Sequence, residues 1–434
     1  MLPQWVIEKK RDGNELSEQE IRWFIKGFTT GEIADYQMAA MAMAIYLRGM
    51  NPAEVAVLTD AMMRSGDLVD TSSIKAPKVD KHSTGGIGDK VSLILAPLVA
   101  CCGVAVPMIS GRGLGITGGT LDKMESIPGY RTNLSDKEFV DVIQKCGCSI
   151  IGQTGQLAPA DKKLYALRDV TGTVPSIALI TASIMCKKLA EGIDALVLDV
   201  KWGKGAFMRT QKDARALALS MVRVGKKMKK GMAALITDMN QPLGRTAGNA
   251  LEVLESIETL QGKGPKDLTD ITVAFAVEML IQSKKTKDRK KAEAQCRELL
   301  QNGKAFAKFR EMVILQGGDV SVIDDPSRLA QARIIHHVTA TKSGFITKAD
   351  AESIGKACVF LGAGRSRTDQ AVDFAVGVSG IRKIGEKVKK GDTLITVHAN
   401  DEGKLSEALK LIADAYTISS KAVKPPKLIY ERIT

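Results

Sequence analysis

Two glycine-rich segments decide how the chain is expected to fold: residues 81–89, KHSTGGIGD, and residues 110–120, SGRGLGITGGT. The first segment follows Val79 and precedes an apolar stretch at 91–102, and a short β-rich run at 104–109 leads into the second. This order of strand, loop, helix, strand and loop is typical of a parallel sheet whose ligand-binding loops follow the carboxyl ends of the strands. Further strands are predicted at 149–152, 195–201 and 233–239. We therefore expect a large α/β lobe with a mixed, mostly parallel sheet.

The composition of both segments favours binding of a phosphate group. Glycines let backbone N–H groups approach an anion, and nearby hydroxyls and cations can bind it directly. The 11 positions 110–120 hold five glycines, which is more than turn formation alone requires. Residues 113–118 also match the dinucleotide pattern G-x-G-x-x-G, but the acidic residue expected about 20 positions later is absent. Phosphate or a phosphate ester is therefore the favoured ligand.

Two further domains are expected on either side of this lobe. Helix starts are predicted at Ser17, in a capping box, and at Asn51, which precedes a first-turn proline. The Ala- and Met-rich stretch 36–46 is expected to be buried against other helices or against a second subunit. The expected domains are a helical lobe of residues 1–65 with 159–192, a phosphate-binding α/β lobe of residues 70–158 with 193–335, and a C-terminal α+β domain of residues 336–434.

The composition narrows the class of protein. The chain has 434 residues, of which 44% are hydrophobic and 26% charged, as expected of a globular enzyme with several domains. It contains no apolar run of about 18 residues, and its charged start lacks a signal peptide, so we expect a cytoplasmic protein with no membrane partner. The net charge of +13 favours anionic ligands, but with only 4% aromatic residues nucleic acid is not an expected partner. The seven cysteines are expected to be reduced thiols.

Residues 110–125, SGRGLGITGGTLDKME, resemble the signature segment of the thymidine and pyrimidine-nucleoside phosphorylases. Further segments with the same resemblance are 81–89, 163–169 (KLYALRD), 183–188 (SIMCKK), 197–201 (VLDVK), 205–208 (GAFM) and 241–244 (QPLG). The resemblance implies reversible phosphorolysis, in which phosphate displaces the base of uridine, thymidine or deoxyuridine with inversion. The products would be the free base and a (deoxy)ribose 1-phosphate, as in pyrimidine salvage. It implies no required cofactor, with inorganic phosphate as the co-substrate.

The resemblance also assigns roles to individual residues. Those implied to bind phosphate are Lys81, Ser83, Ser92, Ser110 and Thr120, and those implied to hold the base are Tyr165, Arg168, Ser183 and Lys187. Arg168 and Lys187 would stabilise the departing base as catalytic groups, and their spacings from Tyr165 and Ser183 place each pair on one helix face. His82 would lie near the sugar and the base, where it is either a catalytic proton donor or a simple hydrogen-bonding residue.

A potassium site is a further implication of the resemblance, with Gly88, Leu243, Thr246 and Glu255 as its residues. This sequence departs from the family pattern at Lys90, where a small or hydroxyl residue is expected. The ammonium of Lys90 could occupy or repel the place of the cation. Thr246 is also a substitution, although it still offers a backbone carbonyl.

The resemblance implies a homodimer joined through the amino-terminal helices and a cleft that closes between the two lobes. Hinges are predicted near residues 65–70, 154–156 and 191–194. Three alternatives remain: an anthranilate-type phosphoribosyltransferase, a nucleoside monophosphate phosphorylase and a nucleoside-binding regulator without catalysis. The first would need acidic pairs for magnesium and pyrophosphate, the second is expected to carry an additional amino-terminal domain, and the third has no use for a site for the nucleophile.

Overall fold

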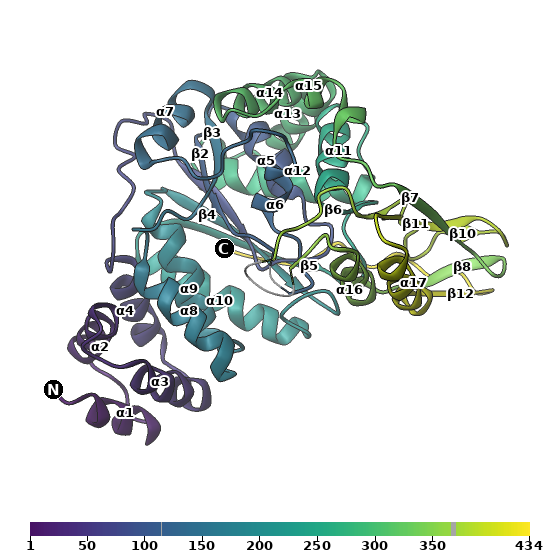
Figure 1. Cartoon of the computed structure of the whole chain (residues 1–434). Helices are drawn as coiled ribbons and strands as arrows, with labels where there is room; N and C mark the ends of the chain where they lie inside the picture. The colour runs from purple at the N-terminus through teal and green to yellow at the C-terminus, as the bar shows by residue number, and fades with distance from the viewer. Residues whose placement is uncertain (114, 366–369) are drawn as a thin grey trace.

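The computed structural model describes residues 1–113, 115–365 and 370–434, so Leu114 of the second glycine segment lies outside the described residues. A small helical lobe, a large α/β lobe and a C-terminal domain follow one another across the molecule (Figure 1). The predicted fold class is confirmed. Within the described ranges, no helix is both long and apolar enough to cross a membrane.

The helical lobe combines the start of the chain with a later excursion. Its helices are α1 (Pro3–Arg11), α2 (Glu18–Thr30), α3 (Asp35–Arg48), α4 (Pro52–Met63), α8 (Pro159–Thr171) and α9 (Ile177–Ala190). The capping box predicted at Ser17 and the helix cap predicted at Asn51 are both present, because each side chain accepts from the backbone N–H three residues later. Helices α8 and α9 pack against α2, α3 and α4, which brings residues 159–190 into the same lobe.

The central sheet places both glycine segments at the carboxyl ends of strands. Parallel strands β1 (Val79–Ser83), β4 (Ala195–Trp202) and β5 (Gly231–Asp238) lie side by side in the order β1-β4-β5. A second parallel pair, β2 (Val106–Ser110) and β3 (Cys148–Gly152), is joined to it by a bridge between Lys78 and Ala105. Strand β1 therefore ends in the first glycine segment and β2 in the second.

Helices surround these strands (Figure 1). They are α5 (Val91–Ala100), α6 (Thr120–Glu125), α7 (Asp136–Cys146), α10 (Gln211–Lys227), α11 (Asn249–Leu260), α12 (Lys266–Gln282), α13 (Arg289–Gln301), α14 (Lys304–Leu315) and α15 (Ser321–Asp324), followed by a short 3-10 turn at Pro326–Arg328. Helix α5 is buried almost all round, as its uninterrupted apolar sequence predicts. All seven cysteines are free thiols, and only Cys101 among them is partly exposed.

The C-terminal domain is α+β, as predicted, but the chain crosses its expected boundary twice. Its elements are β7 (Ile334–Thr339), β8 (Gly344–Ala349), α16 (Ala351–Leu361), β9 (Gly377–Ser379), β10 (Lys387–Val388), β11 (Thr393–Ala399), α17 (Glu402–Ala415) and β12 (Tyr416–Ser419). Strand β6 (Ala247–Gly248) leaves the α/β lobe to pair with β9, and β13 (Ile429–Ile433) returns to pair antiparallel with β5. A boundary at residues 335 and 336 captures neither crossing, because strand pairing at a sheet edge joins segments far apart in sequence.

The three segments that connect the helical and α/β lobes lie against one another. The Asp67 N–H donates to the Gln156 carbonyl at 3.0 Å, and the Val69 N–H donates to the Ala190 carbonyl at 2.9 Å. The Thr71 hydroxyl donates to the Gly192 carbonyl, also at 2.9 Å. The three predicted hinge segments thus lie side by side, and their bending stays a prediction.

Candidate active site

One cavity of about 280 Å³ lies between the helical lobe and the α/β lobe. It brings together every residue predicted to bind phosphate or the base. From the α/β lobe it is lined by Lys81, His82, Ser83, Ser92, Ser110 and Thr120, and from the helical lobe by Tyr165, Arg168, Ser183 and Lys187. Two groups of residues, within 81–120 and 165–187, therefore face one space, with the glycine segments on one side and α8 and α9 on the other.

Lys81 has a buried ammonium group without a hydrogen-bond acceptor. Its side chain is 1% exposed, and Nζ lacks any hydrogen-bond partner within the described part of the chain. The nearest carboxylates, Asp89 and Asp199, lie 3.8 and 3.7 Å away, and Nζ is 5.5 Å from the centre of the Phe275 ring. The charge of Lys81 is thus paired, but its N–H donors are not hydrogen-bonded. Because an unmade buried hydrogen bond is costly, this ammonium is suited to an anion that enters the cavity.

The first glycine segment is fixed by Asp89. The Ser83 hydroxyl donates to Asp89 Oδ2 at 2.6 Å and accepts from the Gly85 N–H at 3.1 Å. Burial by itself would raise the pKa of Asp89, but Lys201 and Lys81 outweigh burial and lower it, so Asp89 is a carboxylate. The Ser83 proton therefore points to Asp89, and its hydroxyl must rotate before it can donate to a phosphate.

The second glycine segment is fixed by Asp122 of α6. The Gly113 N–H donates to Asp122 Oδ2 at 2.7 Å, and a Cβ at Gly119 would lie 2.0 Å from the Gly113 nitrogen. Only glycine permits that approach of the two backbones. Arg112 is paired with two carboxylates of α6 rather than left available for a ligand. The sequence analysis missed Arg365 of the C-terminal domain, which binds Asp122 Oδ1 at 2.7 Å.

The helical lobe contributes two cations held in different ways. Arg168 is 1% exposed and donates only to backbone carbonyls, those of Thr173, Val174 and Leu179, at 3.4, 2.6 and 3.1 Å. Burial lowers the pKa of Arg168, and the guanidinium has no carboxylate partner among the ion pairs of the described residues. It is therefore a fixed positive charge at the cavity wall that a ligand can approach.

Lys187 is held by an acidic residue that the sequence analysis did not single out. Its ammonium donates to the Ser183 hydroxyl at 3.1 Å and forms an ion pair with Asp161 Oδ2. Asp161 lies four residues before Tyr165 and seven before Arg168, so all three share one face of α8. That spacing was readable from the sequence and could have identified Asp161 as a positioning residue.

His82 lies between the two groups and is neutral at pH 7. Burial lowers its pKa well below the usual 6.5, and the charges of Lys188, Lys187 and Lys81 lower it further. A neutral imidazole can donate a hydrogen bond, but it is a poor source of a full proton. A phosphate anion bound beside Lys81 would raise the pKa of His82 and make it a better acid.

The apolar wall of the cavity includes residues that sequence reasoning did not assign. Val174, Ile180, Phe207, Met208 and Leu217 line it, and Phe207 is 50% exposed. Phe207 and Met208 belong to the segment GAFM, whose family resemblance could have identified both as residues of the cavity.

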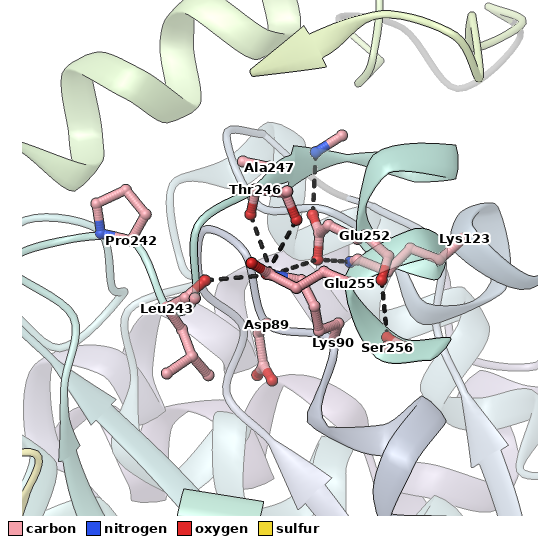
Figure 2. A network of polar contacts seen from close by, with 12 residues as sticks. Asp89, Lys90, Lys123, Pro242, Leu243, Thr246, Ala247, Glu252, Glu255 and Ser256 are labelled. Atoms are coloured by element: carbon pink, nitrogen blue, oxygen red, sulfur yellow. Dashed lines mark hydrogen bonds and ion pairs between the residues drawn. The ribbon is translucent and has the colours of Figure 1, made fainter. Parts of the chain in front are cut away.

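The residues predicted for potassium also converge, but around the side chain of Lys90 (Figure 2). The carbonyls of Leu243 and Thr246 accept from Lys90 Nζ at 3.2 and 3.1 Å, and Glu255 Oε2 accepts at 2.5 Å. Gly88, with φ of +73°, comes so close that a Cβ there would lie 2.4 Å from the Leu243 oxygen. The donor set thus faces an ammonium that the chain itself supplies.

Three segments of the chain match models of known protein families. Residues 4–66 match the helical bundle domain of the glycosyl transferase family, and residues 75–306 match its a/b domain. Residues 345–419 match the pyrimidine nucleoside phosphorylase C-terminal domain. The chain therefore belongs to this glycosyl transferase family.

Similar proteins of known name identify the family more specifically. Pyrimidine-nucleoside phosphorylase of Geobacillus stearothermophilus is 48% identical over 429 residues, and that of Staphylococcus aureus strain N315 is 49% identical over 429 residues. Each match covers 99% of both chains. The chain belongs to the pyrimidine-nucleoside phosphorylase family, which confirms the resemblance stated above.

A solved structure of a different enzyme has a similar fold. Anthranilate phosphoribosyltransferase from Thermus thermophilus superposes with a TM-score of 0.60 at 18% identity, over 72% of this chain and 99% of that one. At this identity the similarity concerns the fold alone.

Proposed function

We propose that the chain is a cytoplasmic pyrimidine-nucleoside phosphorylase, which transfers the pentose of uridine, thymidine or deoxyuridine to inorganic phosphate. One observation carries the proposal: a single cavity joins a buried ammonium without an acceptor, Lys81, to a second cationic wall of Arg168 and Lys187. The first charge is suited to the nucleophile and the second to the leaving base. The full-length relatives named pyrimidine-nucleoside phosphorylase support the same reaction.

Phosphate would bind at the ends of β1 and β2. There Lys81 supplies charge, the glycine segments supply backbone N–H groups, and Ser92, Ser110 and Thr120 supply hydroxyls. Binding would give Lys81 the hydrogen-bond acceptor that it lacks, so the free energy gained includes a buried hydrogen bond that is otherwise unmade. Holding the anion against the anomeric carbon converts an encounter in water into an oriented attack.

The base would lie against α8 and α9. Cleavage of the glycosidic bond leaves negative charge on the pyrimidine, and Arg168 and Lys187 stabilise that charge in a site largely shielded from water. Asp161 holds Lys187 in place through their ion pair. Phosphate attacks from the opposite lobe, so the configuration at C1′ inverts. The products are the free base and the α-anomer of (deoxy)ribose 1-phosphate.

His82 lies where it could donate to the base or to the sugar. Its lowered pKa means that it is neutral before phosphate binds, so a hydrogen bond from the neutral ring is its first role. Proton donation to the leaving base would follow once the bound anion offsets the nearby lysines. Arg168 and Lys187 need no such proton to stabilise the anion.

Ultraviolet assay of uridine, thymidine and deoxyuridine, each with and without phosphate, tests the proposal. We expect base release that requires phosphate, and a single α-anomeric sugar phosphate by NMR. Base release without phosphate, or none with it, would overturn the proposal. Parallel incubations with uridine monophosphate, and with anthranilate, phosphoribosyl pyrophosphate and magnesium, distinguish the two other transferase activities.

The helical lobe offers a surface for a second copy of the chain. Helices α1 and α3 are in contact and expose Trp5, Tyr36, Tyr46 and Leu47, with 63%, 76%, 42% and 70% of each residue accessible. Helices α1 and α3 lie at the end of the molecule away from the C-terminal domain (Figure 1). We propose that these exposed apolar side chains form the homodimer interface that the family resemblance implies.

Sedimentation of the wild type should show a dimer, and the double variant Leu47→Glu with Tyr36→Glu should be a monomer. A monomeric wild type would contradict the proposed interface.

A further inference from the structure

The ammonium of Lys90 is completely enclosed and completely satisfied. Lys90 immediately precedes α5, and its side chain has no exposed surface. An ammonium has three N–H donors, and three oxygens accept them: the carbonyls of Leu243 and Thr246 and Glu255 Oε2. No donor is left for a water molecule or a ligand. The Lys90 ammonium is therefore fully hydrogen-bonded by a fixed set of buried oxygens.

The charges around Lys90 balance without a metal ion. Glu255 lies 2.5 Å from Nζ, and Glu252, 4.0 Å away, is shared with Lys123 at 3.4 Å (Figure 2). Burial alone would lower the pKa of Lys90, but Glu255 and Glu252 outweigh burial and raise it, so the amine stays charged. Two ammonium groups and two carboxylates thus form a buried cluster of balanced charge, and the neighbouring pair of Lys383 and Asp267 adds one charge of each sign.

A monovalent cation does not fit this shell as it stands. Backbone carbonyls and a carboxylate are suitable ligands for potassium, and Leu243, Thr246 and Glu255 supply them. Those same oxygens already accept from Nζ, so an ion bound to them would lie next to an ammonium of like charge. It would also leave the cluster with an unbalanced positive charge away from water, which proteins avoid.

We propose that the Lys90 ammonium is a covalently tethered replacement for a monovalent cation, so that this chain folds and works without potassium. Because the ammonium belongs to the chain, the positive charge is present at every salt concentration and cannot dissociate. The inference rests on the contacts of Lys90 and holds whether or not the proposed reaction is correct.

The position of Lys90 explains why a fixed charge is useful there. Asp89, the preceding residue, organises the first glycine segment through Ser83, and Ser92 lies in the first turn of α5. The turn at 243–246 leads into β6, which pairs with β9 of the C-terminal domain. Lys90 thus ties the phosphate-binding segment to the turn that carries the C-terminal domain.

The first test compares wild-type protein in potassium, sodium and tetramethylammonium chloride at equal ionic strength. Thermal unfolding midpoints should agree within about 1 °C, since no ion binds the native state selectively. A midpoint that rises and saturates with potassium, relative to tetramethylammonium, would overturn the proposal. The readout is stability, so a failure of the proposed reaction would not affect it.

The second test restores the ion site. Lys90→Ser removes the ammonium but keeps the carbonyls and Glu255, so its unfolding midpoint should be low in tetramethylammonium and rise with potassium until the site is saturated. Lys90→Met is the matched control, because it fills the space without charge and should not respond to potassium. Lys212→Ser, at an exposed position of α10, should behave as wild type. A folded Lys90→Ser protein that ignores potassium would overturn the proposal.

Crystals of the wild type grown in rubidium give a direct answer that does not depend on the variants folding. No anomalous density should appear among Leu243, Thr246 and Glu255. A rubidium peak there would overturn the proposal.

Discussion

Lys81 and Lys90 are the same residue type, nine positions apart, and both are buried, yet their surroundings are opposite. Lys81 is 2% exposed and has no hydrogen-bond acceptor among the described residues, whereas Lys90 is fully buried and has three. Lys81 faces a cavity and Lys90 faces a closed shell of oxygens. An unsatisfied buried charge points to a missing ligand, and a satisfied one points to structure. Burial alone does not distinguish the two.

The largest effect on stability is expected from replacing Lys90. Lys90→Met leaves Glu255 buried without its cation, so the free energy of unfolding should fall by about 3–5 kcal/mol. Urea unfolding measures this loss, with Lys212→Met as a control expected to stay within about 0.5 kcal/mol of wild type. A loss below about 1 kcal/mol would show that Lys90 does not hold the shell together.

At Lys81 we expect the reverse pattern. Lys81→Met removes the charge proposed for phosphate but breaks no hydrogen bond, and Asp89 and Asp199 keep Lys201 as an ion-pair partner. We therefore expect kcat/KM to fall by roughly 10²–10³-fold while the free energy of unfolding changes by only about 1 kcal/mol. Kinetics with varied phosphate and urea unfolding measure the two effects. A variant as destabilised as Lys90→Met, with normal phosphate kinetics, would invert the comparison.

Arg168 extends the comparison to the other lobe. Among the described residues its guanidinium donates only to backbone carbonyls, so its charge is not neutralised by a carboxylate. Arg168→Ala should therefore lower kcat by roughly 10²-fold through loss of charge at the leaving base. Phosphate binding, measured by calorimetry, should be largely retained. Arg223→Ala, at an exposed position of α10, is the control. A loss confined to phosphate affinity would show that the lobes are assigned the wrong way round.

The smallest expected effect concerns His82 and pH. Because the pKa of His82 is lowered in the folded protein, the unfolded chain binds a proton below about pH 6.5 that the folded protein does not. Wild type should therefore lose up to about 1.4 kcal/mol of stability per pH unit below that value, relative to His82→Gln. Urea unfolding of both proteins between about pH 7.5 and about pH 5 measures the difference. A difference independent of pH would contradict the cause given for the pKa.

Local patterns predicted the elements and much of the candidate site. The capping boxes at Ser17 and Asn51 and the strands that end in the glycine segments depend on neighbouring residues, which the sequence displays. The glycine segments and the α8 and α9 segments were recognised as one site because their motifs are long and occur in family order. Asp161 was readable from its helical spacing but was not singled out.

Other features depend on contacts between distant residues and could not be read locally. Strand β13 pairs with β5, and Arg365 binds Asp122, across separations that no periodicity reports. The orientation of the Ser83 hydroxyl toward Asp89 likewise depends on how the first glycine segment closes.

The sequence by itself determined the fold class and the family, and through the family resemblance it named the residues of the expected potassium site. It placed Lys81 in a phosphate-binding segment and marked Lys90 as a departure from the family pattern. Only the tertiary structure decided what each ammonium faces, because Leu243, Thr246 and Glu255 reach Lys90 from more than 150 positions away. Whether a buried charge is satisfied depends on which distant oxygens arrive within hydrogen-bond distance, and that is settled by packing.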